Sequence, residues 1–305
     1  MIDGTIALID DNNKFCLFNI IKDKINIVFS VDLEENMCNI HSIIQLDDGN
    51  LVIAGNKIHL YKLKQNGIEI IDNIDAYSSK LRKLSKDKII IYHSPKIYLY
   101  SYENNKIIDQ KYSFEISELK YKSYSFLELF NCVAPSTGLN DLFVVNENEI
   151  LIFYIYDGIG DNNFTNYFIF YNVKKGKKIK SIKIGNKNAR SAEFSFYDKN
   201  NLFSCYDKKI FLIDLKNLDI KKTINIDNLE TYGRALSIIT LNEKFILVSL
   251  KEKGGNFIRQ YEFENQKKLK LEYKKQIQGE YTFIGKCNGN NLIMKISKNS
   301  FMICS

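Results

Sequence analysis

Three histidines are the residues of this chain best suited to act as metal ligands or general bases: His41, His59 and His93. Each lies within or just after a short apolar run, and no two have the spacing that would place a pair of ligands on one helix face. His59 lies between Ile58 and Leu60, so we expect it on a sheet face or at the surface. No carboxylate or cysteine cluster accompanies them. The spacing predicts neither a catalytic residue nor a metal site.

The second candidate for chemistry is the segment 157–161, Asp-Gly-Ile-Gly-Asp, which superficially resembles a calcium or phosphate loop. It lacks the ligand spacing and the final Glu of an EF-hand. No helix pattern follows it, so no helix N-terminus would supply backbone amides to a phosphate. No dinucleotide or P-loop glycine motif occurs elsewhere. We interpret the segment as a polar loop between strands and predict no cofactor.

The net charge of +7 raises the question of nucleic-acid binding. Arginine, the usual residue for bidentate phosphate or guanine contacts, occurs only at Arg82, Arg190, Arg234 and Arg259. The other basic residues are lysines scattered over expected strands and turns. Their densest run, 174–180, is typical of a solvated hairpin turn and one strand edge. We therefore expect no nucleic-acid partner.

The N-terminus places acidic residues beside a short apolar run and has no basic region, so we predict no signal peptide. No segment approaches the roughly 18 consecutive apolar residues of a membrane span. The cysteines are far apart and form no CxxC pair, which is typical of reduced thiols in an intracellular protein. We expect a cytoplasmic protein without membrane insertion. The cysteines are Cys16, Cys38, Cys132, Cys205, Cys287 and Cys304.

The elements that must position any site come from a repeat. A hydrophobic cassette recurs at 14–20, 57–63, 96–102, 167–173, 209–215 and 257–263. Most copies start about 40 residues apart, the length of one four-stranded blade of a β-propeller. The repeat therefore predicts an all-β propeller of antiparallel blades.

The clearest unit is 36–78. It contains apolar strands at 40–46, 51–54, 57–63 and 68–71, here named A to D, separated by Gly/Asn/Asp turns that are typical of antiparallel hairpins. The same frame fits 79–117, 187–228 and 229–279. Inner strands are nearly continuous apolar runs, as expected where both faces are buried, and D strands alternate.

One interval is irregular, because the cassettes at 96 and 167 are separated by nearly twice the usual distance. Strands A, B and C fit 142–145, 149–153 and 167–173. This leaves an insertion at 118–141 before A and a long B–C loop at 157–166. A hidden extra blade is the alternative.

The chain starts with a strand-B pattern, because 3–9 aligns with 48–53, and ends with A, B and C patterns at 282–285, 291–296 and 300–304. Five full and two partial units predict a seven-bladed propeller with incomplete first and last blades; six and eight blades are alternatives. We expect a single domain over 1–305, which is either an imperfectly closed ring or part of a longer protein.

The cassettes also carry a family resemblance. Where a WD40 repeat has Trp-Asp, this chain has Phe18-Asn19, Tyr61-Lys62, Tyr100-Ser101, Tyr171-Asn172, Ile213-Asp214 and Tyr261-Glu262. The chain thus resembles a degenerate WD40-like repeat propeller over essentially its whole length. It has no Trp and no Gly-His dipeptide, so the family's histidine-dependent hydrogen-bond network is not implied. The resemblance implies the propeller shape and no particular member's function.

In a propeller the D–A and B–C loops emerge on the face that usually binds partners. The segments 118–141 and 157–166 should lie side by side there. The first is strongly apolar, so it is either an extra strand or helix that covers a sheet edge or a partner-binding patch. We predict a non-enzymatic scaffold that binds a protein or peptide partner on this loop-rich face. The alternative is a propeller enzyme or carbohydrate-binding protein that uses the central channel, although the A strands offer few ionisable residues. The candidate partner-binding residues are Tyr121, Tyr124, Phe126, Phe130, Asp157, Asp161 and Phe164.

Overall fold

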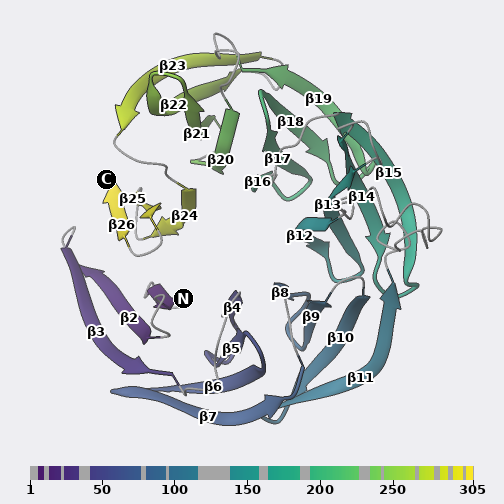
Figure 1. Ribbon diagram of the computed structural model, residues 1–305, viewed down its shortest axis with the longest axis vertical. Helices are drawn as coiled ribbons and strands as arrows, with labels where there is room; N and C mark the ends of the chain where they lie inside the picture. The colour runs from purple at the N-terminus through teal and green to yellow at the C-terminus, as the bar shows by residue number, and fades with distance from the viewer. Residues whose placement is uncertain are drawn as a thin grey trace, which may run out of the picture. The chain divides into compact units, whose positions relative to one another are not determined.

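Every regular element in the described part of the computed structural model is a β-strand (Figure 1). The structure describes residues 6–9, 14–21, 24–33, 42–76, 80–93, 96–115, 138–157, 164–185, 193–226, 234–241, 244–264, 268–277, 282–287, 291–297 and 300–304. The all-β class expected from the repeat is thereby confirmed.

The strands form separate sheets in which hydrogen-bonded neighbours are always neighbours in sequence. The N-terminal sheet has three strands, β1 (Ile6–Ile9), β2 (Lys14–Ile21) and β3 (Lys24–Asp32). Two four-stranded sheets follow: β4 (Ser42–Gln45), β5 (Leu51–Ala54), β6 (Ile58–Lys64) and β7 (Gly67–Ile74), then β8 (Lys80–Lys83), β9 (Lys88–His93), β10 (Lys96–Glu103) and β11 (Lys106–Glu115).

The second half of the chain continues in the same way. The next four-stranded sheet contains β12 (Gly138–Asn146), β13 (Glu149–Asp157), β14 (Phe164–Asn172) and β15 (Lys177–Gly185). It is followed by β16 (Glu193–Asp198), β17 (Asn201–Tyr206), β18 (Lys209–Asp214) and β19 (Asp219–Asn225), and by β20 (Arg234–Thr240), β21 (Phe245–Glu252), β22 (Gly255–Glu264) and β23 (Lys268–Ile277). The last sheet has three strands, β24 (Thr282–Cys287), β25 (Asn291–Ser297) and β26 (Ser300–Cys304).

Among the described residues there are thus five four-stranded sheets between two three-stranded ones, as the A-to-D frame predicts. The chain divides into two compact units. The first holds the sheets β1–β3, β4–β7 and β8–β11; the second holds β16–β19, β20–β23 and β24–β26; the sheet β12–β15 is shared between them. The blade number and the single domain over 1–305 stay predictions.

Two expected connections are shorter than the sequence suggested. Strand β12 begins at Gly138, so 138–141 belongs to a strand and not to the insertion. Strand β13 continues to Asp157 and β14 begins at Phe164, which removes both ends of the expected loop 157–166. The β-formers Tyr154, Ile155 and Thr165 explain the longer hairpin. Because β12 neighbours β13, the lengthened strand also gives β12 a longer partner.

Buried side chains stack neighbouring sheets within each unit. In the first unit, alternate residues of β5 face different ways: Leu51 and Ile53 join a cluster with residues of β2, whereas Val52 and Ala54 join one with residues of β8 and β9. In the second unit, residues of β17 and β18 form one cluster with residues of β21. Each fully buried aliphatic or aromatic side chain contributes about 1.5–3 kcal/mol. Burial on both faces explains why the B strands are continuously apolar.

The cassettes coincide with a repeated irregularity of the C–D pairing. The outer strand D carries additional residues opposite the same two cassette positions, which is the geometry of a β-bulge. These bulges increase the local twist of the outer strand. They lie between Leu17/Phe18, Leu60/Tyr61, Leu99/Tyr100, Leu212/Ile213 and Gln260/Tyr261.

Candidate functional site

Most of the sequence-predicted partner-binding residues fall outside the described part of the chain. Asp157 is the last residue of β13 and Phe164 the first of β14, so both lie at the B–C end of their hairpin. Whether the connections on this face lie side by side stays a prediction. The residues outside the described ranges are Tyr121, Tyr124, Phe126, Phe130 and Asp161.

The histidines do not assemble a catalytic or metal site in the described residues. His59 is buried in β6, and its ring stacks on that of Tyr61 with the centroids 5.9 Å apart. His93 is exposed at the end of β9, and His41 lies outside the described residues. Within the described ranges, no three His, Cys, Asp or Glu side chains converge where they could hold a metal ion. Among the described residues, neither Cys16 nor Cys205 forms a disulfide.

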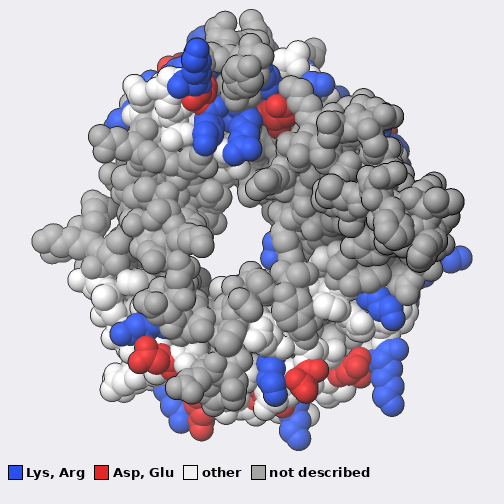
Figure 2. Space-filling view, in the orientation of Figure 1, with Lys and Arg blue, Asp and Glu red and all other residues white. Residues whose placement is uncertain are grey.

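On the face drawn in Figure 2, the described residues do not form one continuous basic patch. Acidic side chains lie beside lysine and arginine side chains at several places on this face. Among the described residues there is also no helix long and apolar enough to cross a membrane.

A pocket of about 390 Å³ opens in the first compact unit, where turns of the sheets β8–β11 and β12–β15 meet. We call it the turn pocket. Its walls come from the A–B turns of both sheets, the C–D turn of the second, and strands β10 and β11. It is lined by Leu84, Lys88, Leu99, Gln110, Tyr112, Glu147, Asn148, Val173 and Lys174.

One side of the turn pocket is held by aromatic residues of β11. The Tyr112 hydroxyl donates a hydrogen bond to the Lys174 carbonyl oxygen at 2.9 Å. Phe114 stacks on Tyr171, with ring centroids 5.9 Å apart and an interplanar angle of 24°. Burial raises the pKa of Tyr112, so the phenol stays a neutral hydrogen-bond donor at neutral pH. These contacts fasten β11 to the turn that follows β14.

Glycine is required where this turn approaches β11. Gly176 has φ = +58°, and a Cβ added to it would lie 2.9 Å from the Cβ of Phe114. The turns are also tied to strand ends by backbone hydrogen bonds: Val173 N–H donates to the Asn148 carbonyl and Tyr102 N–H to the Asp87 carbonyl, both at 2.7 Å. The walls of the turn pocket are therefore preformed.

A polar junction joins the sheets β4–β7 and β8–β11. The Nδ2 of the buried Asn50 lies 2.9 Å from Asp48 Oδ2, 2.8 Å from the Tyr102 hydroxyl and 3.1 Å from Asn105 Oδ1, so its two N–H groups are shared among three acceptors. The Tyr102 hydroxyl also donates to Asp48. Asp48 is a turn residue whose Oδ1 accepts the Asn50 backbone N–H at 3.0 Å. These polar groups hold the turns together.

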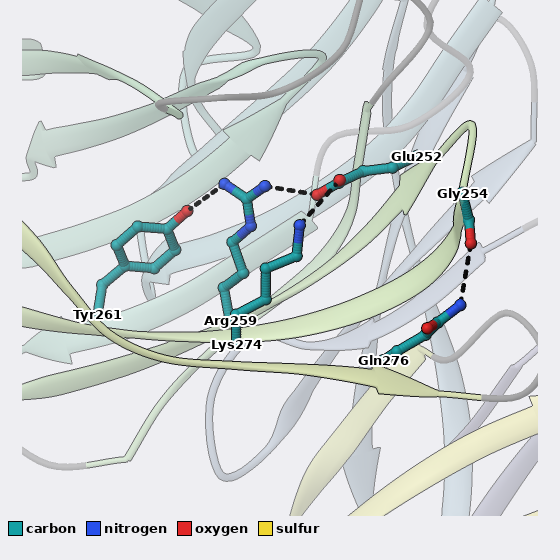
Figure 3. A network of polar contacts seen from close by, with 6 residues as sticks. All are labelled: Glu252, Gly254, Arg259, Tyr261, Lys274 and Gln276. Carbon is teal, nitrogen blue, oxygen red and sulfur yellow. Dashed lines mark hydrogen bonds and ion pairs between the residues drawn. The ribbon is translucent and has the colours of Figure 1, made fainter.

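The second unit contains a buried ion pair that the sequence analysis missed (Figure 3). Arg259 of β22 and Glu252 of β21 have side chains only 2% and 6% exposed, and Nη2 lies 2.5 Å from Oε1. Lys274 of β23 binds the other carboxylate oxygen at 3.0 Å and lies 3.9 Å from the centroid of the Phe257 ring. The Arg259 Nη1 lies 3.4 Å from the Tyr261 hydroxyl.

Aligning the cassettes would have singled out Arg259, although not its partner Glu252, which lies outside the cassette. Arg259 occupies the third cassette position, where Ile169 and Phe211 are buried in other copies. A charged residue at such a position needs a buried partner. Because the carboxylate binds both cations, the group cross-links strands β21, β22 and β23 and is not arranged to act on a ligand.

No protein-family model and no curated protein sequence matches the chain. Solved structures do. The β-propeller domain of Myceliophteria thermophila Cps50 (Swd1) is similar with a TM-score of 0.65 and 10% identity, over 95% of this chain and 89% of that one. A chain of the mitotic checkpoint complex is similar with a TM-score of 0.62 and 10% identity, over 98% of this chain and 85% of that one.

This chain has a WD40-like β-propeller fold. The expectation drawn from the cassettes is thereby confirmed, although the Trp-Asp and Gly-His dipeptides are missing. At 10% identity the likeness shows the fold alone. As many as 1052 solved chains match this chain, so the likeness identifies a widespread fold and no single function.

Proposed function

We propose that this propeller is a non-enzymatic intracellular scaffold that binds a protein or peptide partner on the face where the D–A and B–C connections emerge. The observation that carries the proposal is the fold itself, which is similar over nearly the whole chain to propellers that include a member of a multiprotein complex. A rigid framework of stacked sheets presents loops, and loops on such frameworks bind partners.

The contacts of the described polar residues support this role. The junction around Asn50 and the buried pair of Arg259 and Glu252 stabilise turns and strands. The side chains of these groups are engaged in contacts within and between sheets. We therefore expect a partner to be bound by exposed surfaces and by the connections between strands. The partner-binding residues in this proposal are Tyr121, Tyr124, Phe126, Phe130, Asp157, Asp161 and Phe164.

The proposal is tested by capture from native lysate with three forms of the chain. The first is the wild type, and the second carries Tyr121, Tyr124, Phe126 and Phe130 replaced by Ser. The matched control carries Ile108→Ser and Ile179→Ser, which alter exposed apolar side chains on the outer strands β11 and β15. Circular dichroism establishes that all three fold.

We expect a partner that the wild type and the outer-strand control capture and the loop variant loses. Equal capture by all three would refute the loop-rich face as the binding surface. If the wild type captures nothing, the scaffold function itself is wrong. The intracellular location is tested separately, by fractionating cells that express the tagged chain.

A further inference from the structure

The turn pocket belongs to a different surface from the proposed loop face. In the sheet β12–β15 it is built from the A–B turn at Glu147–Asn148 and the C–D turn at 173–176. Each strand of this meander reverses direction at its turn, so the B–C connection after Asp157 lies at the opposite end of the sheet. A ligand in the turn pocket would therefore leave the loop face free.

Two lysines of the turn pocket are available to an anion. Lys88 and Lys174 are both exposed, and within the described part of the chain neither forms an ion pair. Other exposed lysines do: Lys64 Nζ, for example, lies 2.7 Å from the Glu69 carboxylate. Two unpaired ammonium groups in one concave site attract negative charge and raise its local concentration.

The acidic residues near the turn pocket do not cancel this charge. Glu147 is the only acidic residue in the lining. Asp87, in the turn before Lys88, accepts the Ser85 hydroxyl at 2.8 Å, and this hydrogen bond together with the charges of Lys88 and Lys86 lowers the pKa of its carboxyl. Lys86 and Lys175, next to the lining in sequence, are also exposed. The turns around the pocket therefore carry more lysines than carboxylates.

The remaining lining distinguishes a peptide from a simple anion. Leu99 is half-buried and offers an aliphatic surface, whereas Leu84 and Val173 are buried. Gln110 and Asn148 offer amide groups that can donate to and accept from a peptide backbone. A volume of about 390 Å³ is near the lower end of the range for ligand sites, which suits a short segment. No arginine lines the pocket, although arginine dominates phosphate and base recognition in nucleic-acid sites.

We propose that the turn pocket docks a short acidic peptide segment of a protein partner. Its carboxylates pair with Lys88 and Lys174, and an aliphatic side chain packs against Leu99. Because the Tyr112 hydrogen bond and the close approach of Gly176 hold the walls in place, little order has to be gained on binding. This docking site is independent of the loop-face proposal.

The test uses fluorescein-labelled seven-residue peptides that combine Asp or Glu with Leu, Ile or Val. Binding to the full chain is measured by fluorescence anisotropy. The pocket variant is Lys88→Ala with Lys174→Ala. The control is Lys199→Ala with Lys216→Ala, which removes two exposed lysines from the A–B and C–D turns of the sheet β16–β19. Both variants change the net charge equally, and all four side chains are exposed.

We expect the pocket variant to weaken peptide binding about tenfold and the control variant to leave it nearly unchanged. Replacing the aliphatic residue of the peptide by Ser should weaken binding as well. Equal weakening by both variants would overturn the proposal, because it would show general attraction of acidic peptides. The proposal would also be overturned if inorganic phosphate or single-stranded DNA displaced the labelled peptide as well as the same peptide without the label does. It would likewise be overturned if none of the peptides bound to the wild type. None of these results depends on residues 116–137, so the loop-face proposal is judged separately.

Discussion

Removing Glu252 should destabilise the protein strongly, because it would leave the Arg259 charge buried. The guanidinium cannot lose its proton in a protein, and its side chain is 2% exposed. Breaking a buried ion pair by deleting one partner costs about 3–5 kcal/mol. We therefore expect Glu252→Ala to lower the free energy of unfolding by about this amount. Lys274→Ala should cost less, because the Lys274 side chain is 36% exposed and its loss leaves Arg259 paired with Glu252.

The double variant Glu252→Leu with Arg259→Met separates the cost of an unpaired charge from the loss of packing. It removes both charges, and apolar replacements of a buried pair are often neutral or stabilising. We expect its stability to be close to that of the wild type. Glu69→Ala is the surface control, since the Lys64–Glu69 pair is well exposed and its loss should not move the unfolding midpoint measurably.

Urea unfolding followed by circular dichroism and by tyrosine fluorescence measures these differences; the chain has 19 tyrosines and no tryptophan. The reasoning is refuted if Glu252→Ala lowers the free energy of unfolding by less than about 1 kcal/mol, the value of an exposed pair. It is also refuted if the double variant is as unstable as Glu252→Ala.

Three further predictions concern the turns. Gly176→Ala should destabilise by more than about 1 kcal/mol, because φ is +58° and the new Cβ would meet that of Phe114; an unchanged melting temperature would contradict this. Asn50→Leu should cost about 1–3 kcal/mol in thermal unfolding, because it removes the donor that joins two sheets; a smaller loss would show the junction to be dispensable. The backbone N–H of Asn217 and the other hydrogen bonds to Asp214 hold its pKa below 3.8. The folded state therefore binds this proton more weakly than the unfolded state, and the stabilisation present above pH 3.8 is lost as the pH falls through the folded pKa. Asp214→Asn should reduce the fall in urea midpoint from about pH 6 to about pH 3, and an unchanged fall would contradict the assignment.

The repeated strands could be predicted because their signals are local. The apolar run 51–54 between two turn segments is strand β5 with the bounds that the pattern predicts. The ends of strands next to long connections are harder to predict from the sequence. The segments 154–157 and 164–166 contain residues that favour strands but no stronger local signal. Only pairing with the facing strand decides that these segments continue the ladder. The bulges depend on register between strands C and D, which one strand's sequence does not contain.

The turn pocket could not be derived from sequence for a related reason. The run 174–180 predicts a hairpin turn and one strand edge, and the structure confirms a turn at 173–176 followed by β15. Its closeness to Tyr112 and Lys88 arises only when two sheets pack together. Nothing in the local sequence around Lys88, Tyr112 or 174–180 indicates that these three parts of the chain are neighbours in space.

The meander order of every described sheet also bears on how quickly the chain folds. Each ladder joins strands that are adjacent in sequence, and turns such as Asn104–Asn105 close them with very few residues. Loop-closure entropy for such hairpins is small, and topologies rich in local contacts fold faster than Greek-key arrangements of similar size. The slow step should then be the stacking of finished sheets, with their buried clusters, and not the pairing of strands. Mutations in hairpin turns would accordingly change the unfolding rate less than mutations at residues such as Val52 and Val248, which pack one sheet on another.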